Sequence, residues 1–286
     1  MKRALVLGAD GLLGSRLMRD FAQSGFLVFG TSRAKISRHF DNSSILKFQL
    51  GEPLEGIFKT SKPDVVVNCI VNKYSRFLET SEMIRVNSIF PRKLLEVSRL
   101  FDSFLFLCGT DAVFSGFSGP YKEHQARFPL TTYGFSKCLG DLQSEKSLLL
   151  RFSMIATKMD LNVRSQNISG RIANASPGQV FRASKTSLWN GVTVGLVSRL
   201  IVQLSTLDSK PTGIRHFFSD SCISKFTLLE KLAIHLDRND IKVIPRESYK
   251  RNSPLSTDYD KDYDLFWSLL GFSRPPEIDN LLRVLK

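Results

Sequence analysis

Tyr133 and Lys137 are the two residues of this 286-residue sequence whose spacing most directly suggests acid–base chemistry. Residues four positions apart lie on the same face of a helix, one turn from each other. A phenol, with a reference pKa of about 10, transfers protons poorly at neutral pH, but a fixed ammonium group beside it stabilises the phenolate. The pair is therefore a candidate proton-transfer site, although Tyr-x-x-x-Lys as an isolated pattern is common by chance.

A second candidate site is the glycine-spaced segment 8–14, which reads Gly-Ala-Asp-Gly-Leu-Leu-Gly. It follows a short apolar run at 3–7 and precedes an amphipathic stretch at 13–25, an order typical of strand, tight loop and helix. Glycines, which lack a Cβ atom, let a diphosphate approach the backbone and the helix N-terminus. We expect dinucleotide contacts here, the alternative being a tight turn without a ligand. The expected contact residues are Gly8, Asp10, Gly11, Leu12, Leu13 and Gly14.

The end of the second predicted strand indicates which dinucleotide is preferred. About 20 residues after the glycines, an NAD site presents a carboxylate to the adenosine ribose. This chain has Thr31, Ser32 and Arg33 instead, and a hydroxyl with a guanidinium suits a 2′-phosphate that no carboxylate repels. Lys35 and Arg38 add positive charge nearby. We therefore expect NADP(H) in preference to NAD(H), unless Arg33 is only a solvated loop charge.

Short apolar runs alternate with helical patterns through the first half of the chain. Strands that alternate with helices predict an α/β fold with a Rossmann-like, doubly wound parallel sheet. We expect an NADP-binding domain at 1–155 and a smaller C-terminal lobe at 156–286 that mainly binds substrate, with part of the chain free to return to the first domain. The predicted strands are 3–7, 26–30, 45–50, 65–70, 104–107 and 148–152, and the predicted helices include 84–100, 133–145 and 192–204.

The composition is that of an ordinary globular protein, with 42% apolar and 23% charged residues and a net charge of +13. Such a charge raises nucleic acid, membrane headgroups and anionic small molecules as partners. No nucleic-acid module, membrane span or signal peptide is visible, so we expect a cytoplasmic protein without nucleic-acid or membrane partners. Cys69, Cys108, Cys138 and Cys222 form no C-x-x-C pair, which predicts reduced thiols, and we expect no metal site.

Further motifs stand in a fixed order along the chain, and together they resemble an extended short-chain dehydrogenase/reductase. Within that superfamily the sequence is most similar to the dTDP-4-dehydrorhamnose reductases and related sugar-nucleotide reductases. The likeness covers nearly the whole chain and is strongest in the first 155 residues. The motifs are Gly8/Gly11/Gly14, Asn68, Asn87, Thr110-Asp111-x-Val113-Phe114-x-Gly116, Pro120-Tyr121-x-Glu123, Pro129, Tyr133-x-x-x-Lys137, Leu150-Arg151 and Trp189-Asn190-Gly191-Val192-Thr193.

The resemblance implies a role for each matched residue. Tyr133 is expected to protonate the nascent alkoxide while NADPH delivers hydride to a ketone carbon, and Lys137 to lower the phenol pKa and hold the nicotinamide ribose. Thr110 is expected to hydrogen-bond the carbonyl oxygen. The expected cofactor-binding residues are Ser32, Arg33, Asn68, Cys69, Ile70, Asn87 and Lys137 in addition to the glycine loop, and the expected substrate-binding residues are Asp111, Val113, Met154, Arg182 and Lys185.

Departures from the family pattern narrow the chemistry. Ala112 stands where sugar-nucleotide dehydratases carry a glutamate, which disfavours dehydration, and no histidine lies between residues 151 and 200, which disfavours epimerisation. Gly109, Met154 and Gln49 replace a usual serine, tryptophan and aspartate. Arg182 and Lys185 lie in a basic segment that suits a nucleotide diphosphate.

The expected function is therefore NADPH-dependent reduction of the keto group of a nucleotide-activated deoxy-keto sugar, for the synthesis of a surface polysaccharide or glycoconjugate precursor. Two alternatives stay open. One is a sugar-nucleotide epimerase of the same superfamily, and the other is a non-catalytic NADP-binding regulatory subunit, as in methionine adenosyltransferase. The family often forms homodimers, but no apolar stripe of this sequence indicates one.

Overall fold

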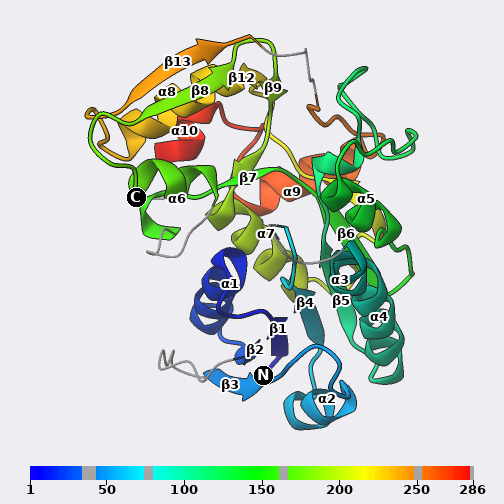
Figure 1. Cartoon of the computed structure of the whole chain (residues 1–286). Helices are drawn as coiled ribbons and strands as arrows, with labels where there is room; N and C mark the ends of the chain where they lie inside the picture. The colour runs from blue at the N-terminus through cyan, green and yellow to red at the C-terminus, as the bar shows by residue number, and fades with distance from the viewer. Residues whose placement is uncertain (34–42, 74–79, 161–166, 248–252, 284–286) are drawn as a thin grey trace.

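A seven-stranded parallel sheet forms the centre of the protein, shown in a computed structural model that describes residues 1–33, 43–73, 80–160, 167–247 and 253–283 (Figure 1). The strand order is β11-β6-β5-β4-β1-β2-β3, and every neighbouring pair is parallel. The order reverses between β1 and β4, the point at which a doubly wound sheet opens a crevice for ligands. The strands are β1 (Arg3–Leu7), β2 (Leu27–Ser32), β3 (Ser43–Lys47), β4 (Val65–Asn68), β5 (Phe104–Cys108), β6 (Ser147–Arg151) and β11 (Gly213–His216).

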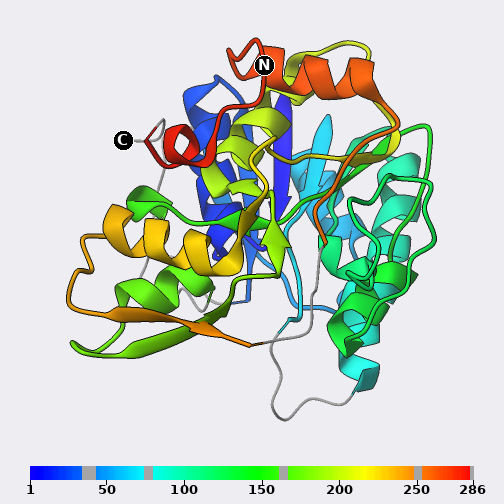
Figure 2. The same ribbon diagram turned by 90° about the horizontal axis from the view of Figure 1, so that it is seen from above.

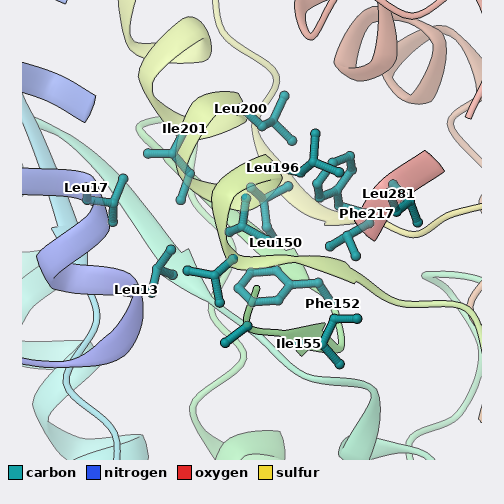
Figure 3. Packing of buried hydrophobic residues seen from close by; sticks show 14 of the residues in the cluster. Leu13, Leu17, Leu150, Phe152, Ile155, Leu196, Leu200, Ile201, Phe217 and Leu281 are labelled. Atoms are coloured by element: carbon teal, nitrogen blue, oxygen red, sulfur yellow. The ribbon is translucent and has the colours of Figure 1, made fainter. Parts of the chain in front are cut away.

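The central strands are apolar on both faces because helices cover both faces. On one face, α1 (Leu12–Gln23) packs against α7 (Val194–Thr206), and both contribute to one core cluster with β6. Figure 3 shows Leu13 and Leu17 of α1 in this cluster beside Leu150 of β6. On the other face lie α2 (Glu55–Ser61) and α4 (Phe90–Leu100), whose buried side chains form a second cluster with β1, β4 and β5. The predicted doubly wound α/β class is confirmed.

Two predicted helices differ from the observed ones. The region predicted as one helix at 84–100 consists of α3 (Thr80–Ile84), a π-helical turn η1 (Arg85–Ile89) and α4. The helix predicted at 133–145 is α5 (Thr132–Leu139), which ends at Gly140. A Cβ atom at Gly140 would lie 2.0 Å from the carbonyl oxygen of Asn87 in η1, a distance that only glycine tolerates. The helix therefore ends where the chain passes closest to η1.

The chain beyond residue 155 both returns to the sheet and builds a separate layer. Strand β11 pairs with β6, while α7 packs on α1. The separate layer contains a parallel ribbon of β8 (Val180–Ser184) and β13 (Lys242–Arg246), along which α8 (Lys225–His235) lies (Figure 2). The remaining elements are β7 (Met154–Ile155), β9 (Leu188–Trp189), β10 (Val192–Thr193), β12 (Ile223–Ser224), α6 (Ile168–Ala173), α9 (Asp260–Leu269), α10 (Ile278–Arg283) and the 3-10 turns η2 (Asp111–Val113) and η3 (Lys158–Asp160). Within the described ranges, none of these helices is long and apolar enough to cross a bilayer.

Candidate active site

The glycine loop is shaped by close backbone contacts that exclude side chains. Gly8 has a φ of +82°, and the amide of Gly11 donates to its carbonyl at 3.1 Å. A Cβ atom on Gly14 would lie 2.1 Å from the same carbonyl oxygen. The loop therefore requires glycine at Gly8 and Gly14, the first for its backbone conformation and the second for the close approach of helix to strand.

The first turn of α1 suits an anion. The helix begins after Gly11 with no side-chain cap and no acidic residue in its first turn, so its first amides have no capping side chain. Such amides bind phosphate, and the helix dipole favours negative charge at this end. The backbone of Leu12, Leu13 and Gly14 would thus hold the diphosphate of a bound dinucleotide.

Thr31 at the end of β2 fixes the glycine loop and was not among the predicted contact residues. Its hydroxyl accepts from the Gly8 amide at 3.2 Å, and its carbonyl accepts from the Ala9 amide at 2.9 Å. The available signal was a polar residue two positions before Arg33, because a buried hydroxyl at a strand end needs a hydrogen-bond partner.

The predicted adenosine-ribose region holds one unexpected charge. Ser32 donates its hydroxyl hydrogen to a carboxylate oxygen of Asp10 at 3.3 Å, and Arg33 is exposed. The sequence predicted that no carboxylate would lie at this strand end, yet the glycine loop brings one there. Lys35 and Arg38 lie outside the described residues.

The end of β4 lines the glycine loop from the other side. The Asn68 carboxamide oxygen accepts from the Ile70 amide at 3.1 Å, and the Cys69 amide donates to the Leu7 carbonyl at 2.9 Å. A Cβ atom on Gly8 would lie 3.2–3.3 Å from atoms of Cys69 and Ile70. Two predicted cofactor residues, Cys69 and Ile70, therefore pack directly against the glycine loop, and Asn68 holds the backbone of Ile70.

Asn87 joins three segments of the site. Its carboxamide accepts from the Asn72 amide at 3.0 Å and donates to the Asn72 carbonyl at 2.8 Å. It also donates to the Ser136 hydroxyl at 2.9 Å, which in turn donates to the Tyr133 carbonyl at 2.8 Å. Through these contacts the Asn87 side chain positions α5 and the loop after β4. The sequence predicted instead that Asn87 contacts the cofactor. The prediction missed Ser136, although it directly precedes Lys137 and faces the protein interior.

Helix α5 places Tyr133 and Lys137 one turn apart as predicted. Thr131 caps the helix by accepting from the Gly134 amide at 3.0 Å. The Lys137 ammonium donates to the Cys108 carbonyl at 2.7 Å. Burial lowers the pKa of Lys137, against the opposing influence of Cys108, Asp141 and Cys69. Tyr133 is half-buried, and its ring centroid lies 5.5 Å from the ammonium nitrogen of Lys73, a second nearby cation that sequence reasoning did not identify.

Thr110 and its neighbours pack directly against this helix. A Cβ atom on Gly134 would lie 2.2 Å from the Ala112 carbonyl oxygen, so α5 contacts the turn after β5 at the closest distance that glycine permits. The Thr110 hydroxyl accepts from the Ala112 amide at 3.2 Å and lies 3.3 Å from a carboxylate oxygen of Asp111. Thr110, Tyr133 and Lys137 are therefore gathered at the carboxyl end of β5, where doubly wound folds place ligands.

The predicted substrate residues are less closely grouped. Val113 is fully buried in a cluster with Phe114 and Tyr121, so its side chain is unavailable to a ligand. Met154 is half-buried on β7. Arg182 is exposed on β8, and Lys185 lies over the Phe226 ring. Across the described ranges, no hydrogen bond or ion pair joins Arg182 or Lys185 to α5.

A cavity of about 250 Å³ lies away from the predicted catalytic residues, none of which lines it. It opens between the turn at Gly119 and Pro120, the residues Leu188 and Asn190, and the segment 254–256. Phe218 and Asp220 also line it. Its walls therefore combine residues from both halves of the chain without including Thr110, Tyr133 or Lys137.

A buried ionic network anchors the C-terminal end of α5. Arg151 is 1% exposed and donates to a carboxylate oxygen of Asp141, just after α5, at 2.7 and 3.0 Å. Its guanidinium also lies 3.2 Å from a ring nitrogen of His216. Burial lowers the pKa of His216 to about 4, although the nearby Glu123 carboxylate opposes the shift. His216 is therefore neutral at physiological pH.

The fold and the sequence match together identify a Rossmann-fold member of the extended short-chain dehydrogenase/reductase superfamily. The chain belongs to the RmlD substrate binding domain family, which matches residues 1–254. The sequence-based resemblance to this superfamily is thereby confirmed.

Relatives of the chain carry two different names. The dTDP-4-dehydrorhamnose reductase of Aggregatibacter actinomycetemcomitans is 27% identical over 243 residues, which cover 78% of this chain and 76% of that protein. Methionine adenosyltransferase 2 subunit beta of Xenopus laevis is 27% identical over 142 residues, covering 49% of this chain and only 42% of that protein. The second match therefore spans less than half of its relative.

Solved structures share the fold over nearly the whole chain. The dTDP-4-dehydrorhamnose reductase of Bacillus anthracis, in complex with NADP, has a TM-score of 0.72 at 18% identity and covers 99% of this chain and 97% of its own. The dTDP-glucose 4,6-dehydratase of the same organism, in complex with NAD, has a TM-score of 0.77 at 16% identity, with 99% and 95% covered. Identities this low establish similarity of fold alone.

Proposed function

We propose that this protein is an NADPH-dependent reductase of the keto group of a nucleotide-activated deoxy-keto sugar. The observation that carries the proposal is the grouping of Thr110, Tyr133 and Lys137 at the carboxyl end of β5. The family match and the relative named dTDP-4-dehydrorhamnose reductase support the substrate class. The product would enter a surface polysaccharide or glycoconjugate, and we propose a cytoplasmic location with the chain after residue 155 mainly binding the sugar nucleotide.

We assign each residue of the group the role that the family resemblance implies, and its contacts support that role. When bound, a reduced nicotinamide supplies the hydride. Tyr133 donates its phenolic proton to the ketone oxygen, and the ammonium of Lys137, held by the Cys108 carbonyl, stabilises the phenolate that remains. The Thr110 hydroxyl, which donates to the Asp111 carboxylate at 3.3 Å without substrate, donates to the same ketone oxygen when substrate is bound and keeps accepting from the Ala112 amide.

NADP(H) preference is a proposal that rests on Arg33. The exposed guanidinium at the end of β2 can pair with a 2′-phosphate. The Asp10 carboxylate beside Ser32 opposes this preference, because it lies where a 2′-phosphate would approach. Arg33→Ala should therefore weaken NADPH binding more than NADH binding, and an equal loss for both would mean that the 2′-phosphate is read elsewhere.

The test of the proposed function is oxidation of NADPH, compared with NADH, in the presence of dTDP-, UDP- and GDP-linked 4-keto sugars. Tyr133→Phe is the control variant, because it keeps the ring and removes the proton. We expect turnover with one sugar nucleotide in the native protein, and binding of NADPH with little turnover in the variant. Turnover that Tyr133→Phe leaves unimpaired would remove Tyr133 from the mechanism.

A second candidate function is regulation of a partner enzyme without catalysis. The similarity to methionine adenosyltransferase 2 subunit beta over half of this chain favours it. The two functions differ in one measurable respect: a regulator binds NADPH tightly without oxidising it against any keto sugar of the panel. Co-purification of a partner whose activity changes with NADPH would then support regulation.

A further inference from the structure

Cys69 and Cys108 are neighbours at the carboxyl edge of the sheet. Parallel pairing of β4 with β5 aligns Asn68 with Leu107, and the next residues along the two strands are Cys69 and Cys108. Both side chains pack against the same core cluster, so they emerge on the same face of the sheet. Neighbouring strands lie about 4.7–4.9 Å apart, within the Cα separation of about 4.4–6.8 Å that a disulfide accepts.

The two thiols differ in acidity because they interact. The hydrogen bond from the Cys69 thiol lowers the pKa of Cys108, with a further contribution from the Lys137 ammonium and against the effect of burial. The same interaction, together with burial, raises the pKa of Cys69. Cys108 is therefore the more acidic thiol of the pair, and Cys69 is the thiol that donates to it. Both cysteines are free, and neither residue is fully buried.

We propose that Cys69 and Cys108 are a site of reversible disulfide formation with small disulfides. The Cys108 thiolate attacks the reagent, its S–S bond breaks, and one thiolate leaves while a mixed disulfide forms on Cys108. Cys69 then gives up its proton to water and attacks the Cys108 sulfur, which expels the second reagent thiolate. Two protein thiols are oxidised and one reagent disulfide is reduced to two thiols.

The pair is connected to the glycine loop and to Lys137 through backbone atoms. Atoms of Cys69 and Ile70 lie 3.2–3.3 Å from the position of a Cβ atom on Gly8, so movement of Cys69 toward Cys108 shifts the wall of the loop. The Cys108 carbonyl holds the Lys137 ammonium at 2.7 Å. Oxidation should therefore weaken dinucleotide binding about tenfold, the effect of losing one well-placed charge-assisted hydrogen bond.

The experiment uses the full-length chain with Cys138→Ser and Cys222→Ser, so that only the two neighbouring thiols remain. After incubation with glutathione disulfide, we expect both thiols to be lost, intact mass to fall by two hydrogen atoms, and dithiothreitol to restore them. Adding Cys69→Ser should stop the reaction at a glutathione adduct on Cys108, whereas adding Cys108→Ser should leave Cys69 largely unmodified. Circular dichroism identifies any variant that fails to fold. In that case the disulfide is located by peptide mapping of the oxidised native protein instead of by the variant.

Two results would overturn the proposal. One is a folded protein that keeps both thiols while its urea-unfolded form oxidises, and the other is an adduct on Cys69 that forms equally fast without Cys108. These thiol measurements are independent of the proposed function. The dinucleotide effect rests on that function and is measured by NADPH titration of the reduced and oxidised forms. Equal affinity of the two forms would refute the link to the glycine loop, while a reduced form that binds no NADPH would refute the proposed cofactor instead.

Discussion

Replacement of Gly134 by alanine should separate the predicted catalytic residues without changing their identity. The added Cβ atom would lie 2.2 Å from the Ala112 carbonyl oxygen and 3.0 Å from a side-chain atom of Pro129. An ordinary contact begins at 3.4 Å, so α5 and the turn after β5 must move apart by about 1.2 Å. Tyr133 adjoins Gly134 on the helix, and Thr110 precedes the turn, so the movement widens the space between them.

The expected magnitude follows from that displacement. Misplacement of a reacting group by about 1 Å can reduce the rate about 100-fold, and we expect a loss of this size in kcat for the reductase reaction. The forced separation should also lower the free energy of unfolding by about 1–3 kcal/mol. Alanine contributes roughly 1 kcal/mol more than glycine inside a helix, which offsets only part of this loss. NADPH affinity should change less than kcat, because the glycine loop lies outside α5 and, of the expected cofactor-binding residues, only Lys137 lies on that helix.

Gly56 provides the matched control, because it also lies in a helix and a Cβ atom there meets nothing within 4 Å. Gly56→Ala should leave kcat unchanged and stabilise the protein by up to about 1 kcal/mol. The assays are steady-state NADPH oxidation with the accepted sugar nucleotide and urea unfolding followed by circular dichroism. A Gly134→Ala protein as stable and as active as Gly56→Ala would refute the argument that this glycine sets the approach of α5 to the turn.

Three further changes test other contacts of the site. Asp10→Asn should favour NADPH over NADH by several-fold in paired titrations, because it removes the carboxylate beside Ser32, and an unchanged ratio would show that this carboxylate does not face the 2′-phosphate. Asn87→Ala should lower kcat and stability together, by about 1–3 kcal/mol in unfolding, because the Ser136 hydroxyl and the Asn72 backbone lose their partner; unaltered unfolding would contradict its positioning role. Between pH 6.5 and about 4, His216 binds a proton in the unfolded state but not in the folded state, where burial lowers its pKa. The free energy of unfolding should therefore fall by up to about 1.4 kcal/mol per pH unit as pH decreases. A free energy of unfolding that stays constant over this pH range would contradict the depressed pKa.

The elements that the sequence predicts correctly are those with local signals. Residues 3–7 form an uninterrupted apolar strand, and the glycines of 8–14 are needed by the backbone of that segment itself. The spacing of Tyr133 and Lys137 is likewise a property of one helix. Such features depend on the chain within a few residues, so periodicity and residue type are enough to identify them.

Features that arise from contacts between distant segments escape the sequence. Strand β11 has four residues and includes His216, so it lacks an apolar run, and its place in the sheet depends on pairing with β6. The predicted helix end at 145 is wrong because Gly140 passes Asn87 and because Asp141 is drawn to Arg151. The Asp10 carboxylate reaches Ser32 only because the glycine loop folds back over β2. Each of these depends on a partner at least ten residues away along the chain.

Arg151 shows why loss of activity in this protein needs a stability measurement beside it. Its guanidinium connects Asp141, at the end of the helix that carries Tyr133 and Lys137, to His216 on β11. Both members of the Arg151–Asp141 pair have side chains only 1% exposed, so removing Asp141 leaves a buried charge unpaired and costs about 3–5 kcal/mol, whereas removing Arg151 leaves Asp141 only the more exposed Arg127 at 3.3 Å. A variant at Arg151 would therefore lose turnover by releasing α5 or unfolding the chain. Tyr133→Phe removes one exchangeable proton from a half-buried ring, so the two kinds of loss are distinguished by the free energy of unfolding and not by kcat.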